Sequence, residues 1–307
     1  MLGEARDQAP IFRIHHDFPA AKDGRRRDVV RHPYRGAVSR LYVAIGDSFT
    51  EGVGDWDSRY PNGVRGWADR VAKQLSKKDP SWRYANLAIR SKRLRQIVDE
   101  QLQPALDLHP TVVSVYAGGN DILELRASIT PLMETYEEMV SRIAAAGARP
   151  LLFTGFDVRL HPVLEPMRRR NWIYNDHVRR IAETYGALLV DYWCFDEYQD
   201  PRFWDIDRLH MSPAGHRNMA AHVLRELGID HTLTSKPLRP RQRLTMTELL
   251  RRESVWWGEW VIPMFGRRLR NVTLGDDLEP RWPVPIRPAD GLKRLAAEHA
   301  ARRACRD

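Results

Sequence analysis

Short apolar runs alternate with amphipathic segments between residues 41 and 228, and this alternation constrains the fold more than any other feature of the sequence. Five of the runs are strand candidates: LYVAIG, WRYANLA, TVVSVYAGG, PLLFTGF and ALLVDY. The segments that follow them place apolar residues three or four positions apart, which is typical of amphipathic helices. Alternating strands and helices form βαβ units, so the sequence predicts an α/β fold with a parallel five-stranded sheet that helices cover on both faces.

Two segments lie outside this alternation. Residues 1–38 are polar and basic with little periodicity, and we interpret them as an N-terminal arm. Residues 231–307 begin as a linker, are helical in LTMTELLRRESVWWGEWVIPMF, Pro-rich and irregular in GRRLRNVTLGDDLEPRWPVPIRPADG, and helical again in LKRLAAEHAARRA. The predicted organisation is an arm, an α/β domain over residues 39–230, and a helical or irregular C-terminal extension over residues 231–307.

The net charge of +9 is concentrated in this extension. Residues 231–307 carry 16 Lys and Arg against 9 Asp and Glu, whereas residues 1–230 carry 33 against 31. A nearly neutral body argues against a nucleic-acid groove, because such grooves are strongly basic. The basic extension leaves open a contact with an acidic surface.

The sequence shows no candidate membrane span, secretory signal or metal site. No run of 18 apolar residues occurs, and the first residues, MLGEARDQAPIFRIHHDF, include early acidic residues and no apolar core. The two cysteines, Cys194 and Cys305, are far apart, so neither a disulfide framework nor a metal cluster is expected. We therefore expect a cytoplasmic protein that needs neither a cofactor nor a metal.

Polar residues follow three of the predicted strands, at what should be one edge of the sheet. Ser48, in VAIGDSFTEGVGD, follows the first strand, Ser91 follows the second, and GGND, with Asn120, follows the third. Ligands of open α/β sheets bind at the carboxyl ends of the strands. Gly, Asp and Ser are also the usual residues of turns, so each stretch alone can equally be a turn. A serine nucleophile requires a base and an oxyanion site elsewhere in the chain.

His210 is the best candidate for that base among the eleven histidines. It lies in DIDRLHMSPAGH, just before the last predicted helix, and Asp207 precedes it by three residues. This spacing can bring a carboxylate to the imidazole Nδ1, which would fix the tautomer while Nε2 faces the serine. An isolated D-x-x-H is more often a loop that caps a helix. His216 competes as the base, but it lies inside the helix and is expected to support structure.

An oxyanion hole needs donors that point to one position beside the oxygen of Ser48. The backbone N–H of Ser48 can be one donor, and the side-chain amide of Asn120 can be a second. The third would be a backbone N–H in the loop after the second strand. GGND by itself also fits a plain turn.

Together, these pieces resemble the GDSL/SGNH hydrolase family over roughly residues 41–228. The resemblance rests on four motifs in the family's order: GDSFTEG with Ser48, NLAIRS with Asn86, GGND with Asn120, and DRLH with Asp207 and His210. It implies a flavodoxin-like three-layer α/β/α sandwich. It also implies hydrolysis of esters or thioesters without a metal.

The resemblance implies a role for each motif residue. Ser48 would attack the acyl carbonyl, His210 would act as base and then as acid, and Asp207 would orient His210. The N–H groups of Ser48 and Ser91 and the amide of Asn120 would hold the oxyanion.

One site position departs from the family. The family has glycine five residues after the asparagine of the second motif, Asn86, and this chain has Ser91 there. The donor is a backbone N–H, so serine can supply it, but a Cβ narrows the allowed backbone conformations and crowds the site. Asp47 and Asp121 lie outside the triad, and we assign them to holding the loops through hydrogen bonds to backbone N–H groups.

These features predict a serine hydrolase that cleaves carboxylic or thio esters of a small or lipid-like substrate. A deacetylase of O-acetylated carbohydrates is an alternative within the same family. A different alternative is a weakly active or degenerate fold that serves as a binding or membrane-surface module. It draws on Ser91 and on the extension, which groups Trp256, Trp257 and Trp260 with Arg251 and Arg252. These aromatic residues could instead pack on the body or on a second subunit, and the oligomeric state is left open.

Overall fold

The computed structural model describes residues 40–124, 128–157, 165–233, 238, 245–256, 258–259, 263 and 274–304. The predicted N-terminal arm, residues 1–38, lies outside the described residues. So do Trp257 and Trp260 of the extension.

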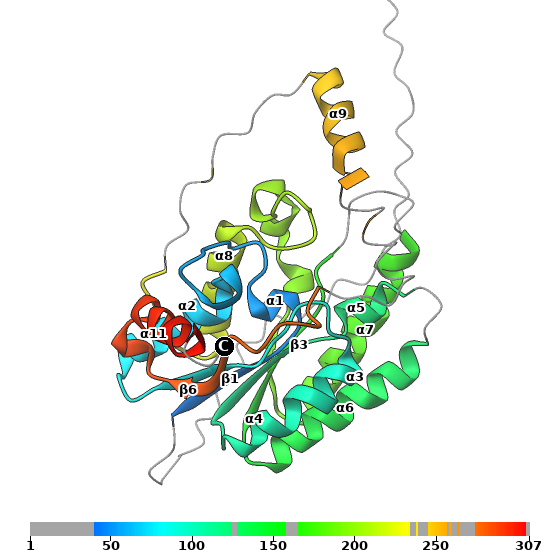
Figure 1. Ribbon diagram of the computed structural model, residues 1–307. Coiled ribbons are helices and arrows are strands. Elements are labelled where there is room, and N and C mark those ends of the chain that lie inside the picture. The colour runs from blue at the N-terminus through cyan, green and yellow to red at the C-terminus, as the bar shows by residue number, and fades with distance from the viewer. Residues whose placement is uncertain are drawn as a thin grey trace, which may run out of the picture. The chain divides into compact units, whose positions relative to one another are not determined.

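A six-stranded sheet with the order β5-β4-β3-β1-β2-β6 forms the centre of the fold (Figure 1). Its strands are β1 (Leu41–Gly46), β2 (Arg83–Asn86), β3 (Val112–Tyr116), β4 (Arg149–Phe153), β5 (Leu188–Val190) and β6 (Trp282–Ile286). The first five strands pair in parallel, and β6 pairs antiparallel with β2. The predicted α/β fold is confirmed, but the sheet has six strands and not five.

The sixth strand lies in the part of the extension that was expected to be irregular. Its sequence, WPVPI, contains Pro283 and Pro285, and proline cannot donate a hydrogen bond to a neighbouring strand. In β6, however, Trp282 and Ile286 are the residues in register with β2, and the prolines alternate with them. The missing N–H groups therefore face the outer edge of the sheet, where they have no neighbour to bond.

Two helical layers enclose the sheet, and each has its own hydrophobic cluster. One layer contains α1 (Ser48–Glu51), α2 (Gly66–Lys78), α8 (Pro213–Glu226) and α11 (Leu292–Ala304). The other contains α3 (Leu94–Ile97), α4 (Gln103–Asp107), α5 (Gly119–Ile122), α6 (Ile129–Ala145) and α7 (Glu165–Thr184). Successive strand residues enter opposite clusters, as Tyr42 and Val43 of β1 do. This arrangement is the three-layer α/β/α sandwich that the resemblance implied.

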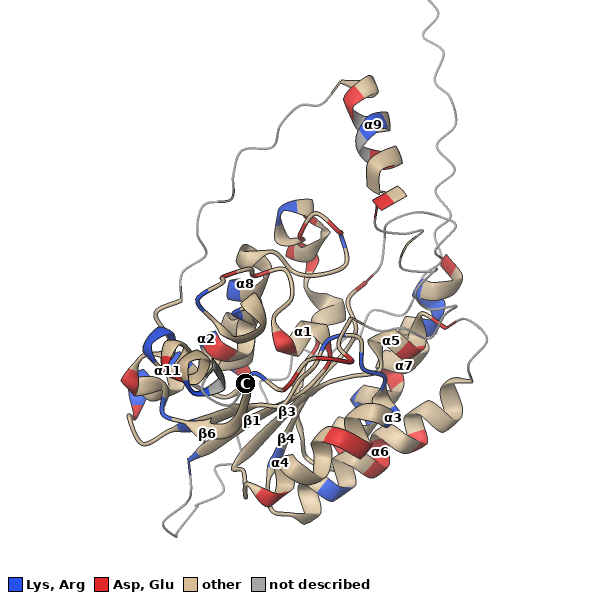
Figure 2. Ribbon diagram, in the orientation of Figure 1, with Lys and Arg blue, Asp and Glu red and all other residues tan. Residues whose placement is uncertain are grey.

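Besides β6, the described part of the extension contains two α-helices and a short 3₁₀ helix, Pro288–Asp290. The helix α11 covers the end of the sheet beside α2, and Lys and Arg residues lie along it (Figure 2). The helix α9 (Met246–Trp256) contains most of the described residues of the tryptophan-containing segment. Among the described helices, none is both long enough and apolar enough to cross a membrane.

Candidate active site

The end of β1 turns directly into helix α1 and places Ser48 at the first helical position. Gly46 has a φ of +147°, and a Cβ there would lie 2.3 Å from the carbonyl oxygen of Tyr116, so a side chain does not fit. Asp47 caps the helix, because its Oδ1 accepts the N–H of Phe49 at 3.1 Å. The sequence GDS therefore forms a tight turn and presents a serine at the same time.

His210 joins Ser48 to Asp207 in one line of hydrogen bonds. Its Nε2 lies 2.8 Å from Ser48 Oγ, and its Nδ1 lies 2.6 Å from Asp207 Oδ2. The other carboxylate oxygen of Asp207 accepts the N–H groups of Leu209 and His210, each at 2.9 Å. The D-x-x-H spacing thus forms the local turn that the sequence allows, and the structure brings the three predicted side chains together.

Hydrogen bonding keeps Asp207 ionised. Burial alone would raise the pKa of Asp207, but its hydrogen bonds and its electrostatic interaction with His210 hold it below its ordinary value. An ionised carboxylate at Nδ1 favours the tautomer that carries its proton there. Nε2 is then left to accept the hydroxyl proton of Ser48.

His216 lies apart from this line. It is fully buried in α8, and its Nε2 donates to the carbonyl oxygen of Val53 at 2.9 Å. Burial lowers the pKa of His216 to about 4, so its ring is neutral near pH 7. These contacts give His216 a structural place, as its position in the helix predicts.

The loop after β2 holds Ser91 in a backbone conformation that favours glycine. The φ of Ser91 is +68°, in the left-handed region. Asn86 fixes the start of this loop, because its amide donates to the carbonyl oxygen of Thr50 at 3.1 Å and its Oδ1 accepts the N–H of Ala88 at 3.0 Å. At this position, where the family has glycine, the backbone φ thus lies in a region that residues with a side chain rarely adopt.

Asn120 lies between this loop and the turn after β1. Its amide nitrogen donates to the carbonyl oxygen of Lys92 at 3.1 Å and approaches Asp47 Oδ2 at 3.4 Å. Burial raises the pKa of Asp47 to about 7 and also raises the pKa of Asp121. Asp121 accepts the N–H of Leu94 at 2.9 Å. Both carboxylates thus accept a backbone N–H, which is the role that the sequence analysis gives them.

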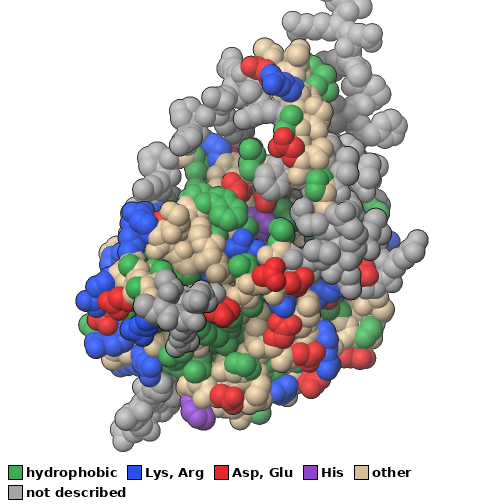
Figure 3. Space-filling model, viewed as in Figure 1, with side chains coloured by type: hydrophobic (Ala, Val, Ile, Leu, Met, Phe, Trp, Pro, Cys, Tyr) green, Lys and Arg blue, Asp and Glu red, His purple; other side chains and the backbone are tan. Residues whose placement is uncertain are grey.

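A small cavity of about 110 Å³ lies between the residues that follow β4 and the loop that precedes His210. It is lined by Phe156, Asp157, Tyr198, Gln199, Pro201, Trp204 and Arg208. The ring of Phe49 links the cavity lining to the triad. Its centre lies 6.2 Å from that of Phe156, which lines the cavity, and 5.8 Å from that of the His210 imidazole. Figure 3 shows hydrophobic side chains gathered on the face of the molecule below α9.

Two contacts of the site escape sequence analysis. Trp256 of α9 donates its indole N–H to the carbonyl oxygen of Asp207 at 2.9 Å, and its ring stacks under the guanidinium of Arg208 at 4.8 Å. Glu51, three residues after Ser48, binds Arg90 beside Ser91. The sequence signal for Glu51 is an acidic residue in the short segment that directly follows the buried first strand. The sequence analysis names Trp256 and allows it to pack on the body, but nothing in its linker-separated segment indicates a contact with the turn of Asp207.

The described residues contain no group of three or more His, Cys, Asp or Glu side chains arranged to hold a metal ion.

Comparison with known proteins matches residues 44–217 to the GDSL-like Lipase/Acylhydrolase family. Three solved structures illustrate the fold. LAE5, an alpha/beta hydrolase enzyme from the metagenome of Lake Arreo, Spain, is 24% identical, with 63% of this chain and 97% of that chain covered and a TM-score of 0.52. Axe2, an acetylxylan esterase from Geobacillus stearothermophilus, is 22% identical, with coverage of 62% and 95% and a TM-score of 0.52. EstA, a psychrotrophic esterase from Pseudoalteromonas sp., is 15% identical, with coverage of 62% and 97% and a TM-score of 0.51. The curated proteins give no match.

The family match spans more than half of the chain and includes every motif that carries the resemblance. Its limits enclose Ser48, Asp207 and His210, the three members of the hydrogen-bonded line. The chain therefore belongs to the GDSL-like lipase/acylhydrolase family of carboxylic ester hydrolases.

Proposed function

We propose that Ser48, His210 and Asp207 are the catalytic triad of this ester hydrolase. The observation that carries the proposal is the position of His210, 2.8 Å from Ser48 Oγ on one side and 2.6 Å from Asp207 on the other. This is the geometry of a nucleophile, a base and a group that orients the base.

In the proposed reaction, His210 Nε2 takes the hydroxyl proton of Ser48 as Oγ attacks the acyl carbon of the ester. The N–H groups of Ser48 and Ser91 and the amide of Asn120 stabilise the oxyanion. Collapse of this intermediate breaks the bond to the alcohol oxygen, which receives the proton from His210. Water then attacks the acyl-enzyme with the same base, releases the acid and restores Ser48.

Replacing the nucleophile tests the proposal. We expect Ser48→Ala to lower kcat for p-nitrophenyl acetate by roughly 10⁴-fold or more and to lose covalent labelling by a phosphonofluoridate. Ser81→Ala is the matched control, because Ser81 is an exposed serine remote from the triad. More than about a tenth of the wild-type activity in Ser48→Ala would exclude Ser48 as the nucleophile, because such a loss is only about 1.4 kcal/mol.

The cavity lined by Phe156, Trp204 and Arg208 favours short acyl esters of a polar alcohol over long-chain lipids. Its volume of about 110 Å³ is small, since pockets for drug-sized ligands measure roughly 300–1,000 Å³. The rings of Phe156 and Trp204 lie beside the polar side chain of Gln199 there, a combination that suits a sugar ring. An acetylated carbohydrate is the second candidate substrate, and the acetylxylan esterase of the same fold suggests the polymer to try first.

A panel of p-nitrophenyl esters from two to twelve acyl carbons measures this preference. We expect kcat/KM to be highest for acetate or propionate, and acetate to be released from acetylated xylan. A maximum at eight or more carbons would identify a lipid-like substrate instead.

A contact between the extension and an anionic membrane surface is a separate proposal. Its support is the basic composition of residues 231–307 and the exposure of Met246 and Leu250 on α9. If the contact is made, the full chain sediments with anionic vesicles at low salt and is released at high salt. Absence of sedimentation at low salt would exclude it.

A further inference from the structure

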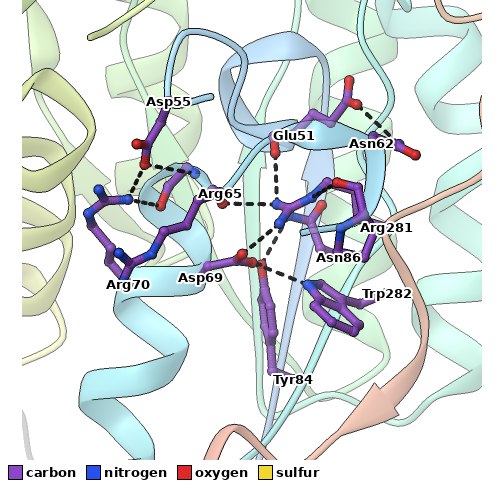
Figure 4. A network of polar contacts seen from close by, with 12 residues as sticks. Glu51, Asp55, Asn62, Arg65, Asp69, Arg70, Tyr84, Asn86, Arg281 and Trp282 are labelled. Carbon is purple, nitrogen blue, oxygen red and sulfur yellow. Dashed lines mark hydrogen bonds and ion pairs between the residues drawn. The ribbon is translucent and has the colours of Figure 1, made fainter. Parts of the chain in front are cut away.

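Figure 4 shows a network of buried charged and polar side chains beneath helix α1. At its centre lies Arg281, which belongs to the C-terminal extension and is fully buried. Its Nη1 donates to the carbonyl oxygens of Glu51 (2.8 Å) and Arg65 (3.0 Å), and its Nη2 donates to Asp69 Oδ2 (2.6 Å). The indole N–H of Trp282 also donates to Asp69, at 3.3 Å. The extension therefore places a paired cation directly at the last residue of the nucleophile helix.

Glu51 connects that helix to the loop of Ser91. Its fully buried carboxylate accepts the backbone N–H of Arg90 at 2.7 Å. It also accepts the guanidinium of Arg90 through both oxygens, at 2.9 and 2.6 Å. Arg90 immediately precedes Ser91, so Glu51 holds the residue whose carbonyl group forms one peptide unit with the Ser91 N–H.

A second part of the extension contacts the peptide unit that joins Arg90 to Ser91. A Cβ on Gly275 would lie only 2.2 Å from the carbonyl oxygen of Arg90. That carbonyl and the Ser91 N–H belong to one planar peptide, so the close approach of Gly275 restricts the direction of the N–H. The carbonyl oxygen of Glu279 adds a contact, since it accepts Asn62 Nδ2, which also donates to Glu51.

We propose that Arg281 and Gly275 of the extension are positioning residues for the oxyanion donor at Ser91. The inference rests on the proposed function, in which that N–H stabilises the oxyanion. Its physical basis is the φ of +68° at Ser91. A side chain is disfavoured in this region, and such a conformation persists only when its surroundings determine it. The family match ends at residue 217, so these contacts come from a part of the chain outside it.

Kinetics of Arg281→Met test the inference. A donor that acts only on the transition state changes kcat and kcat/KM equally, with little effect on KM. We expect kcat for p-nitrophenyl acetate to fall by at least about tenfold. The fall should be smaller than the loss of roughly 10²–10³-fold that follows complete removal of a donor. Arg281→Lys keeps the charge and part of the hydrogen bonding, so its kcat should lie between those of Arg281→Met and the wild type.

Leu292→Ala is the control for a merely structural effect. Leu292 is buried in α11, in the same extension, and makes no hydrogen bond within the network. Both variants are assayed in urea-free buffer at a temperature where circular dichroism shows them fully folded. We expect Leu292→Ala to lose stability and keep kcat. If the kcat of Arg281→Met equals that of Leu292→Ala while Ser48→Ala is inactive, the inference is wrong and the proposed function stands. An active Ser48→Ala removes both.

Gly275→Ala tests the same peptide unit without disturbing a buried charge, and it decides the question if Arg281→Met does not fold. The added Cβ should push the Arg90–Ser91 peptide, so we expect kcat to fall by roughly threefold to tenfold with KM unchanged. A kcat equal to that of the wild type would overturn the inference.

Discussion

Ser91 occupies the site position at which this chain differs from its family, and it does so at a φ of +68°. The sequence motif identifies the substitution, but it does not report the backbone angle that gives the substitution its meaning. A residue with a Cβ is disfavoured in the left-handed region by about 1–2 kcal/mol. Ser91 is therefore held by its neighbours and not by its own preference.

Two substitutions at this position should have opposite effects. We expect Ser91→Gly to keep or raise kcat, because glycine adopts this φ without strain and retains the N–H. Its stability should change little, since relief of strain offsets the added freedom of the unfolded chain, about 0.5–1 kcal/mol. Ser91→Val should lower both kcat and the unfolding temperature, because a β-branched residue is an outlier at positive φ.

Steady-state kinetics and thermal unfolding of both variants measure these effects. A fall of more than about tenfold in kcat for Ser91→Gly, equivalent to about 1.4 kcal/mol, would instead assign a direct role to the hydroxyl.

His216 should make the folded state sensitive to acid. Burial lowers its pKa to about 4, from an ordinary value of 6.5. The unfolded chain therefore takes up a proton below pH 6.5 while the folded chain does not, and stability is lost as pH falls toward 4. Between pH 7.5 and 5 this residue alone removes about 2 kcal/mol from the free energy of unfolding.

Urea unfolding of the wild type and His216→Gln at both pH values measures this contribution as a difference between the two proteins. Glutamine can donate to Val53 and does not titrate, so the variant should lose about 2 kcal/mol less than the wild type. The comparison is needed because the pKa of buried Asp47 is raised to about 7 and acts in the opposite direction. Parallel pH dependence in both proteins would contradict the assignment.

Local spacing explains why part of the site could be predicted. Asp207 and His210 meet within one turn, and Ser48 follows a strand whose carboxyl end must lie at the ligand edge of a parallel sheet. Arg281 could not be found in this way, because its partner Asp69 is 212 positions away and no periodicity links them. Burial of an arginine depends on tertiary contacts alone.

At the scale of elements, the five parallel strands could be predicted because each is an apolar run followed by a helix. The sixth strand could not, because prolines at alternate positions imitate an irregular segment. The prolines are compatible with a strand only because β6 pairs with β2 at the edge of the sheet. The helix α9 could be predicted from its spacing, but its contact with the turn of Asp207 could not.

The contact of α9 with the catalytic turn has a measurable consequence. Trp256 bonds the carbonyl oxygen of Asp207 and stacks on Arg208, whose φ is +55°. We expect Trp256→Ala to loosen this turn and lower kcat/KM by about threefold to tenfold, in line with about 0.5–2 kcal/mol for a cation–π contact. Leu250→Ala, at an exposed position of the same helix, should leave kcat/KM unchanged. Equal values for both variants would show that the turn does not need α9.

At the scale of the whole molecule, removal of the two termini should have unequal results. A fragment of residues 1–233 loses β6, which exposes the edge of β2 to pairing with other chains. It also leaves buried Asp69 without Arg281, and the loss of one partner of a buried ion pair costs about 3–5 kcal/mol. We expect this fragment to aggregate.

A fragment of residues 40–307 retains every described contact of the site and should remain soluble and active. Size-exclusion chromatography and esterase assays compare the two fragments. A soluble 1–233 fragment with wild-type kcat would show that the extension is dispensable.

The antiparallel strand β6 also affects how this chain can vary. A buried guanidinium that comes from beyond residue 280 makes the residues around it, Glu51 and Asp69, dependent on a distant part of the gene. Substitutions at these positions should be tolerated in relatives that lack the extension and rejected here. Recombination or fusion at residue 230, the boundary that sequence periodicity suggests, would separate the enzyme from β6 and from the buried Arg281.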